Sequence, residues 1–154
     1  MSEHAAPRAP LSVEEYLKLE EASRIRHEYV GGAIHAHDGG TSRHNVIATS
    51  ILASLWNAAR GGPCRVYGSD MLLRASEEVF YYPDVMVVCG DEETGDEALY
   101  QVAPCLVVEV TSPARRGGAV VASEAVGPEG VVPVPCPEVE LTLAQIYEGL
   151  QEPA

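Results

Sequence analysis

Two acidic residues stand inside otherwise apolar stretches of the sequence. Asp84 lies in residues 79–89, and Glu109 lies in residues 105–113. Both stretches are rich in β-branched and aromatic residues and predict strands, and their near-continuous apolar character is typical of strands covered on both faces. A carboxylate in such a strand is costly unless it is paired or binds a metal. Because Mg²⁺ and Mn²⁺ prefer oxygen ligands, the two acids together indicate a divalent-metal site.

The sequence also allows a simpler interpretation of these acids. Each could sit in water at a strand end, or could pair with an arginine. A metal site requires that Asp84 and Glu109 lie on neighbouring strands with their carboxylates converging. We therefore predict that arrangement.

Two more acids could join the same site. Glu28 belongs to residues 26–36, where Gly31-Gly32 predicts a hairpin between two extended pieces. It could point toward the later acids, or be a surface acid beside Arg24 or Arg26. Asp70 lies in the apolar stretch 64–74 and could join the cluster or bond to the backbone in an Asx turn.

Histidines and cysteines give weaker signals of metal binding. His44 falls in the first turn of a predicted helix, and His35 and His37 share one face of a strand; with no third ligand nearby, we interpret all three as ordinary histidines. The cysteines form no C-x-x-C pair, so we expect reduced thiols that pack as small hydrophobes, and no zinc site. They are Cys64, Cys89, Cys105 and Cys136.

The elements that must position these residues are also predictable. Ser12 and Glu15 form the capping box of a first helix, which fades between residues 22 and 26. A second helix is expected over residues 43–60, capped by Thr41 or Ser42 and ended by Gly61-Gly62-Pro63. Residues 64–74 then predict a strand that a bulge at Gly68 could interrupt.

Composition restricts the class of protein. A chain of 154 residues predicts one globular domain with a real core. It has no apolar run near the ~20 residues of a membrane span, and its N-terminus does not resemble a secretion signal, so we expect a cytoplasmic protein. The net charge is −13 and Lys18 is the single lysine. Such a chain repels a phosphate backbone, so nucleic-acid binding would have to overcome this charge.

Six short motifs in order resemble one family. They are Leu11–Leu17, Arg26–Gly32, Arg43–Asn45, Gly68–Asp70, Tyr82–Val85 and Val108–Pro113. This series is similar to the Uma-type restriction endonuclease family of the PD-(D/E)XK nuclease superfamily. The resemblance covers residues 11–113 and resumes near residues 135–150.

The resemblance implies a fold, a chemistry and a set of residues. The fold would be α+β, a restriction-endonuclease-like core with helices flanking a mixed β-sheet. Asp84 and Glu109 would bind Mg²⁺ or Mn²⁺, which would activate water and stabilise charge on the scissile phosphate of DNA. Glu28 would be a further catalytic acid from the first hairpin.

The sequence departs from the family after residue 113. Relatives carry an Asp…Lys…Tyr helix followed by a strand, whereas here no lysine follows Lys18. Residues 117–137 are rich in Gly, Ala, Val and Pro, and their glycines and prolines break helix and strand. We therefore expect a flexible tail at 1–10, a nuclease-like core at 11–116, an irregular linker at 117–137 and a closing segment at 138–154. The fold would be incomplete in its C-terminal part.

Two functions follow from these observations. The first is a metal-dependent endonuclease that hydrolyses phosphodiester bonds of nucleic acid, crippled by loss of the lysine. The alternative is a non-catalytic remnant that acts as a binding or self-association domain. A homodimer fits either, because loss of a strand would leave an exposed sheet edge.

Overall fold

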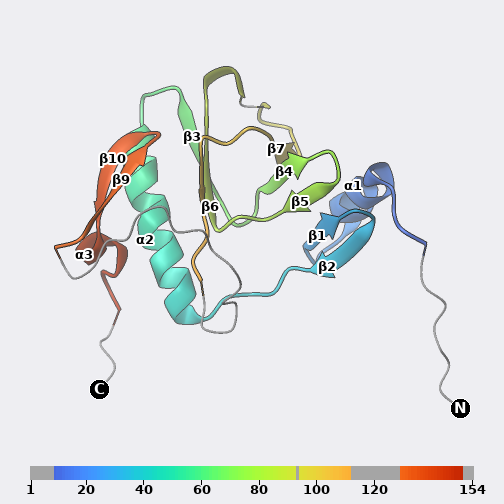
Figure 1. Cartoon of the computed structure of the whole chain (residues 1–154), viewed down its shortest axis with the longest axis horizontal. Coiled ribbons are helices and arrows are strands. Elements are labelled where there is room, and N and C mark those ends of the chain that lie inside the picture. Colours follow the sequence, from blue (N-terminus) through green and yellow to red (C-terminus); the bar gives the residue numbers. More distant parts are fainter. Residues whose placement is uncertain (1–8, 93, 112–128, 151–154) are drawn as a thin grey trace, which may run out of the picture.

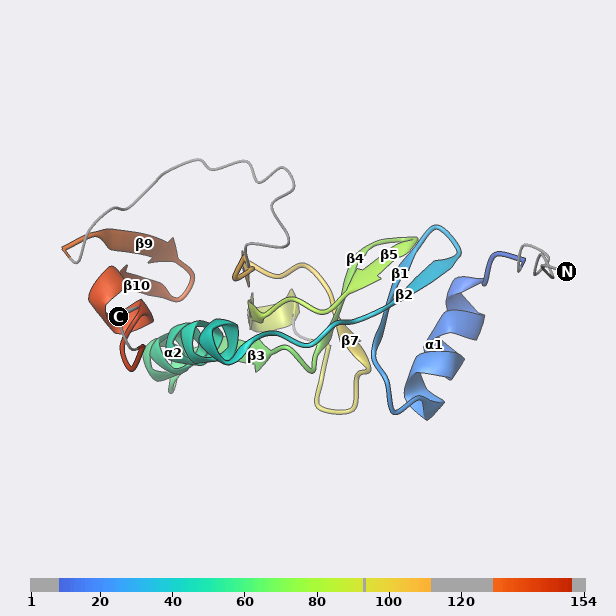
Figure 2. The same ribbon diagram turned by 90° about the horizontal axis from the view of Figure 1, so that it is seen from below.

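The computed structural model describes residues 9–92, 94–111 and 129–150. Across these ranges the chain forms an α+β fold with three sheets, as Figures 1 and 2 show. No helix in the described ranges combines the length and hydropathy that a membrane span requires.

A five-stranded sheet packs beside the first helix, α1 (Val13–Ala22). Its order is β2-β1-β5-β4-β7, and the pairing is antiparallel except between β4 and β7. The strands are β1 (His27–Val30), β2 (Ala33–Ala36), β4 (Leu72–Ser76), β5 (Val79–Tyr81) and β7 (Tyr100–Gln101). The predicted hairpin is confirmed, because β1 and β2 pair around Gly31-Gly32.

Helix α1 begins as predicted. The Ser12 hydroxyl accepts a hydrogen bond from the Glu15 N–H, and the Glu15 carboxylate accepts one from the Ser12 N–H. The helix then buries Tyr16, whose ring stacks on Tyr29 with centroids 4.9 Å apart and whose hydroxyl donates to the His27 carbonyl. This aromatic contact, completed by Phe80, holds α1 on the sheet.

A second, three-stranded antiparallel sheet packs against α2 (Ser42–Ala59). Its order is β3-β6-β8, with β3 at Cys64–Gly68, β6 at Val85–Cys89 and β8 at Leu106–Val108. Helix α2 also packs against a hairpin of β9 (Val131–Pro135) and β10 (Glu138–Thr142) and against the short helix α3 (Leu143–Ile146) (Figure 1). This core consists of Ile51, Leu55, Val85, Val87, Val134, Leu141 and Ile146.

Two predicted strands are wrong in extent. Residues 64–74 and 79–89 are each divided between the two larger sheets. The first divides at the turn after Gly68, and the second divides at Tyr82-Pro83-Asp84, where Pro83 has no N–H for a ladder. Asp84 therefore precedes β6 instead of lying inside a strand. Strand β6 is buried on both faces as expected, but β8 is only half-buried.

The predicted irregular linker is also wrong in part. Residues 117–128 lie outside the described ranges, but Val131–Pro135 form β9 and pair with β10. Alternate residues of a strand direct their N–H positions to the same side, and each strand of a two-stranded sheet has an unpaired outer edge. Pro133 and Pro135 are two residues apart, so both can face that edge, where no N–H is needed. Strand β10 begins at Glu138, the first residue of the expected closing segment. Residues 1–8 of the expected tail lie outside the described ranges.

Candidate functional site

Asp84 is held at the point where the two larger sheets meet. Its side chain is only 11% exposed. Its Oδ2 atom accepts a 2.7 Å hydrogen bond from the Val110 N–H and lies 3.1 Å from the His44 Nε2 atom. Both contacts use Oδ2, and the other carboxylate oxygen, Oδ1, takes part in neither. These two contacts orient the carboxylate through Oδ2.

Glu109 directly follows β8, the neighbour of β6. The antiparallel register pairs Val85 with Val108, and continuing it by one residue sets Asp84 opposite Glu109. Residues directly opposite each other in an antiparallel pair have side chains on the same face. The two acids therefore flank adjacent strands at the same end, as predicted. Convergence of their carboxylates stays a prediction.

Glu28 lies on β1, in the other sheet. Its side chain is 32% exposed, and Oε1 lies 3.2 Å from the Nδ1 atom of His37. Arg26, one of the expected surface partners, instead donates to Asp70 and to the Ser69 carbonyl. Glu28 therefore takes a histidine partner across the hairpin.

Tyr81 links Glu28 with Glu109. It ends β5, and its pKa is raised above the ordinary 10.0 first by burial and then by the negative charges of Glu109 and Glu28. Both carboxylates therefore lie within electrostatic range of one phenol. No local pattern singled out Tyr81, because tyrosines are common in strands.

Asp70 does not join this cluster. It is almost fully exposed and pairs with Arg26. His44, interpreted from the sequence as an ordinary histidine, does join it through Asp84. The motif Arg43-His44-Asn45 was the available signal for His44. His37 was missed in the same way, since Glu28 was considered as an acid of the site or as a surface acid beside an arginine, and not as the partner of a histidine.

Gly40 shapes the loop around His44. A Cβ atom added at Gly40 would lie 2.5 Å from Nδ1 and 2.9 Å from Cγ of the imidazole. Gly39 beside it has nothing within 4 Å of the equivalent position. The loop therefore closes over the His44 ring only because residue 40 lacks a side chain.

The donor set fits a metal that keeps much of its water. In the part of the chain that the structure describes, Asp84, Glu109 and Glu28 do not form a trio of ligands within 4.8 Å of one another; Cys89, Cys105 and Cys136 do. Mg²⁺ typically binds through one or two carboxylates plus water and substrate phosphate. Asp84 and Glu109 could hold such an ion, with the remaining positions taken by water and phosphate.

The cysteines are not the separate reduced thiols that the sequence predicted. Cys64 forms a disulfide with Cys89, its partner across β3 and β6, and Cys105 forms one with Cys136. The Cys89 and Cys105 sulfur atoms are 3.4 Å apart. Spacing along the chain could not show this cluster, because each cysteine comes from a different element or connection.

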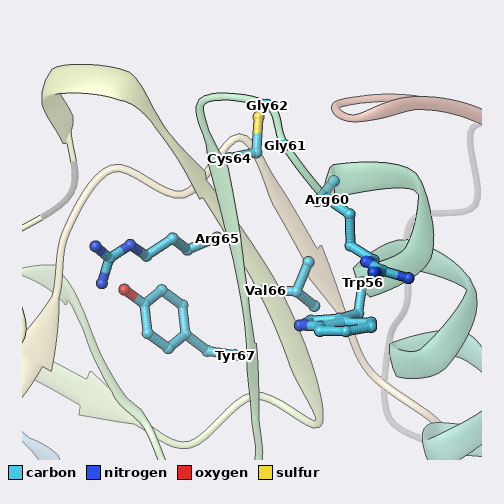
Figure 3. A pocket seen from close by; sticks show the side chains of 9 residues that line it. Trp56, Arg60, Gly61, Gly62, Cys64, Arg65, Val66 and Tyr67 are labelled. Atoms are coloured by element: carbon cyan, nitrogen blue, oxygen red, sulfur yellow. The ribbon is translucent and has the colours of Figure 1, made fainter.

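A surface pocket of about 380 Å³ opens at the C-terminal end of α2 (Figure 3). The exposed indole of Trp56 forms one wall, with the Arg60 guanidinium 5.0 Å from its ring centroid. Tyr67 and Arg65 line the β3 side, and Arg65 is paired with Asp96. Aromatic faces beside guanidinium groups are the surfaces on which nucleic-acid bases and phosphates bind.

Comparison with known proteins identifies the family. Residues 13–118 match the model of the Uma2 family, described as "Putative restriction endonuclease". The chain belongs to the Uma2 family. The family resemblance found in the sequence is therefore confirmed.

Two uncharacterized proteins resemble this Uma2 chain over most of its length. The uncharacterized Synechocystis protein slr1290 is 39% identical over 119 residues, which are 74% of this chain and 62% of that protein. A second, sll1609, is 30% identical over 109 residues, 70% of this chain and again 62% of the relative. The chain thus spans about three fifths of the length of these relatives.

A solved structure confirms the fold. A crystal structure described as a putative nuclease belonging to DUF820 from Anabaena variabilis superposes with a TM-score of 0.71. The match covers 90% of this chain and 98% of the other, at 17% identity. The α+β, restriction-endonuclease-like fold predicted from the sequence is therefore correct.

Proposed function

We propose that this Uma2 chain binds Mg²⁺ or Mn²⁺ at Asp84 and Glu109 and acts as an endonuclease on nucleic acid, at a rate lowered by the lack of a nearby lysine. The observation that carries the proposal is the opposition of the two acids at one end of β6 and β8, with Asp84 held by the Val110 N–H. Membership of the Uma2 family supports the same chemistry.

The metal would supply Lewis-acid stabilisation of charge on the scissile phosphate and a lowered pKa of bound water. The protein's own part is to orient its ligands. The Val110 N–H and His44 fix the Asp84 carboxylate from two sides. Such outer partners commonly change metal affinity 10- to 100-fold when removed. We assign His44 this positioning role.

Glu28 and Tyr81 complete the site from the other sheet. Glu28 is the further acid, oriented by His37 at 3.2 Å. Tyr81 carries its proton at neutral pH, as a phenol with the ordinary pKa of 10.0 does, and can donate a hydrogen bond; burial, Glu109 and Glu28 raise its pKa further. A water or a phosphate oxygen bound between the two carboxylates would be its acceptor.

The lowered rate follows from the missing cation. Lys18 is the only lysine of the chain, and it pairs with Glu14 on the exposed face of α1. A fixed positive charge at the developing phosphate charge is often the largest single contribution to catalysis. Arg115 and Arg116, which could replace it, lie outside the described residues, and arginine does not exchange a proton as lysine can.

Plasmid and single-stranded DNA cleavage tests this proposal. The protein is incubated with each DNA and Mg²⁺ or Mn²⁺, beside Glu109→Ala and beside Asp70→Asn as a matched acid outside the site. We expect the parent chain and Asp70→Asn to cleave DNA equally slowly, at a rate close to the Glu109→Ala background. Rapid cleavage that Glu109→Ala abolishes would contradict the lowered rate but support the site. Failure of millimolar metal to stabilise the protein would contradict the site itself.

A nucleic-acid-binding domain without cleavage is the second candidate. The observation that favours it is the exposed pair of Trp56 and Arg60, which needs no metal to contact nucleic acid. In that case DNA binding persists in EDTA, and prolonged incubation with Mn²⁺ gives no product above the Glu109→Ala control.

A further inference from the structure

Four cysteines from separate parts of the chain gather at one corner of the fold. Cys64 begins β3, Cys89 ends β6, Cys105 directly precedes β8 and Cys136 lies in the turn between β9 and β10. The corner therefore joins the three-stranded sheet to the C-terminal hairpin. Figure 3 shows Cys64 at this edge, next to Gly61 and Gly62.

Three of the sulfur atoms are close enough to share one ion. The sulfurs of Cys89, Cys105 and Cys136 all lie within 4.8 Å of one another, and those of Cys89 and Cys105 are 3.4 Å apart. Cys64 is not within 4.8 Å of all three, but its bond to Cys89 holds it beside them. In a tetrahedral zinc site with Zn–S bonds of about 2.3 Å, neighbouring sulfurs are about 3.8 Å apart. Small movements of the side chains would convert one arrangement into the other.

This group is separate from the carboxylate site. Asp84 and Cys89 stand at opposite ends of β6, which separates them by about 17 Å at the rise of a strand. The ligands also differ in kind, because thiolates select zinc over the hard ions that carboxylates prefer. One protein could therefore hold both ions without competition.

We propose that these four cysteines form a structural zinc site when they are reduced, and that the two disulfides are its oxidised form. Each disulfide takes two electrons and two protons from a dithiol reductant, which becomes a disulfide itself. The four resulting thiols lose their protons as Zn²⁺ binds, giving a complex with a net charge of −2. The Cys105–Cys136 disulfide and the zinc ion would then be alternative links between the sheet and the hairpin.

The site has the features of a structural and not a catalytic zinc centre. Four protein sulfurs leave no open position for water or substrate. Cys105 is exposed and the other three are half-buried, so reductant and metal can reach the cluster. The ion would stabilise the position of the hairpin whose Val134 and Leu141 are buried against α2.

Metal analysis of the reduced protein tests the proposal. The full chain is reduced with a phosphine, incubated with Zn²⁺ and freed of loose metal by gel filtration. We expect one zinc per chain by elemental analysis and native mass spectrometry, and loss of it in Cys136→Ser. The double variant Asp84→Asn, Glu109→Gln should retain its zinc, which would exclude the carboxylate site as the source.

Two further readouts use the unaltered chain, in case a serine variant does not fold. Co²⁺ in place of zinc should give thiolate-to-metal charge-transfer absorption, and Zn²⁺ should protect all four thiols from alkylation. A folded, reduced chain that retains no zinc and whose four thiols alkylate equally fast with and without Zn²⁺ would overturn the proposal.

Discussion

The Asp84 carboxylate accepts a 2.7 Å hydrogen bond from the backbone N–H of Val110, the residue that follows Glu109. The bond ties the start of β6 to the end of β8, so the two acids cannot move apart independently. A carboxylate that accepts a backbone N–H is also oriented before a metal arrives. The site is thus organised by the backbone as well as by side chains.

Removal of the Asp84 charge should abolish metal-dependent stabilisation. At a metal concentration ten times Kd, binding to the folded state alone adds about 1.4 kcal/mol, or about 3–6 °C in Tm for a chain of this size. Asp84→Asn should lose most of this shift, whereas Asp70→Asn should keep it. Thermal unfolding with and without Mg²⁺ measures both. Equal shifts in the two variants would contradict Asp84 as a ligand.

Gly40 and Gly39 provide a matched test of His44. Gly40→Ala would place a methyl group 2.5 Å from the present His44 Nδ1 position, so the ring must move, whereas Gly39→Ala meets nothing within 4 Å. We expect Gly40→Ala and His44→Ala each to weaken metal binding about tenfold, and Gly39→Ala to leave it unchanged. Titration with Mn²⁺ measures the affinities. A Gly40→Ala variant that binds as tightly as the parent would show that His44 does not position Asp84.

The sequence predicted the parts of this site that have a strong local signal. Helix caps, the Gly31-Gly32 hairpin and the buried run of β6 depend on neighbouring residues, and all three were correct. The division of strands between two sheets was missed because it depends on which partner each segment finds. The same reason hid His44 and the cysteine cluster, whose members meet only through sheet pairing.

Glu20 shows another contact that the sequence did not reveal. Its nearly buried carboxylate accepts from the His27 N–H and the Tyr82 hydroxyl and lies 3.0 Å from the His27 ring. Glu20→Ala leaves these groups unsatisfied and should cost about 2–4 kcal/mol of unfolding free energy. Glu21→Ala, on the exposed face of α1, should cost under about 0.5 kcal/mol. Urea denaturation compares them, and equal costs would contradict a structural role for Glu20.

The titration of Tyr81 should depend on two distant acids. Burial, Glu109 and Glu28 raise its pKa above 10.0, so its contribution to stability is full below pH 10 and is lost as pH rises through the higher folded value. Glu109→Gln and Glu28→Gln should each lower this pKa, whereas the exposed Glu77→Gln should not. Tyrosinate absorbance measures the titration, with Tyr81→Phe to assign the signal. Identical curves for all three variants would place Glu28 and Glu109 away from Tyr81.

Trp56 and Arg60 should contribute to nucleic-acid affinity without affecting the metal. Stacking of a base on an aromatic ring contributes about 1–3 kcal/mol, so Trp56→Ala should weaken single-stranded DNA binding by about 5- to 150-fold. Arg60→Gln should also weaken binding and make it less salt-dependent, by about one unit of log–log slope if the guanidinium contacts a phosphate.

The control for this surface is Arg74→Gln, since Arg74 also lies over aromatic rings, those of Phe80 and Tyr100, but on the other sheet. Fluorescence anisotropy with a labelled oligonucleotide at several salt concentrations compares the three variants in EDTA. Because the net charge of −13 opposes association, binding should be detectable first at low salt. Equal losses in Arg60→Gln and Arg74→Gln would mean that general charge, and not the pocket at the end of α2, determines the affinity.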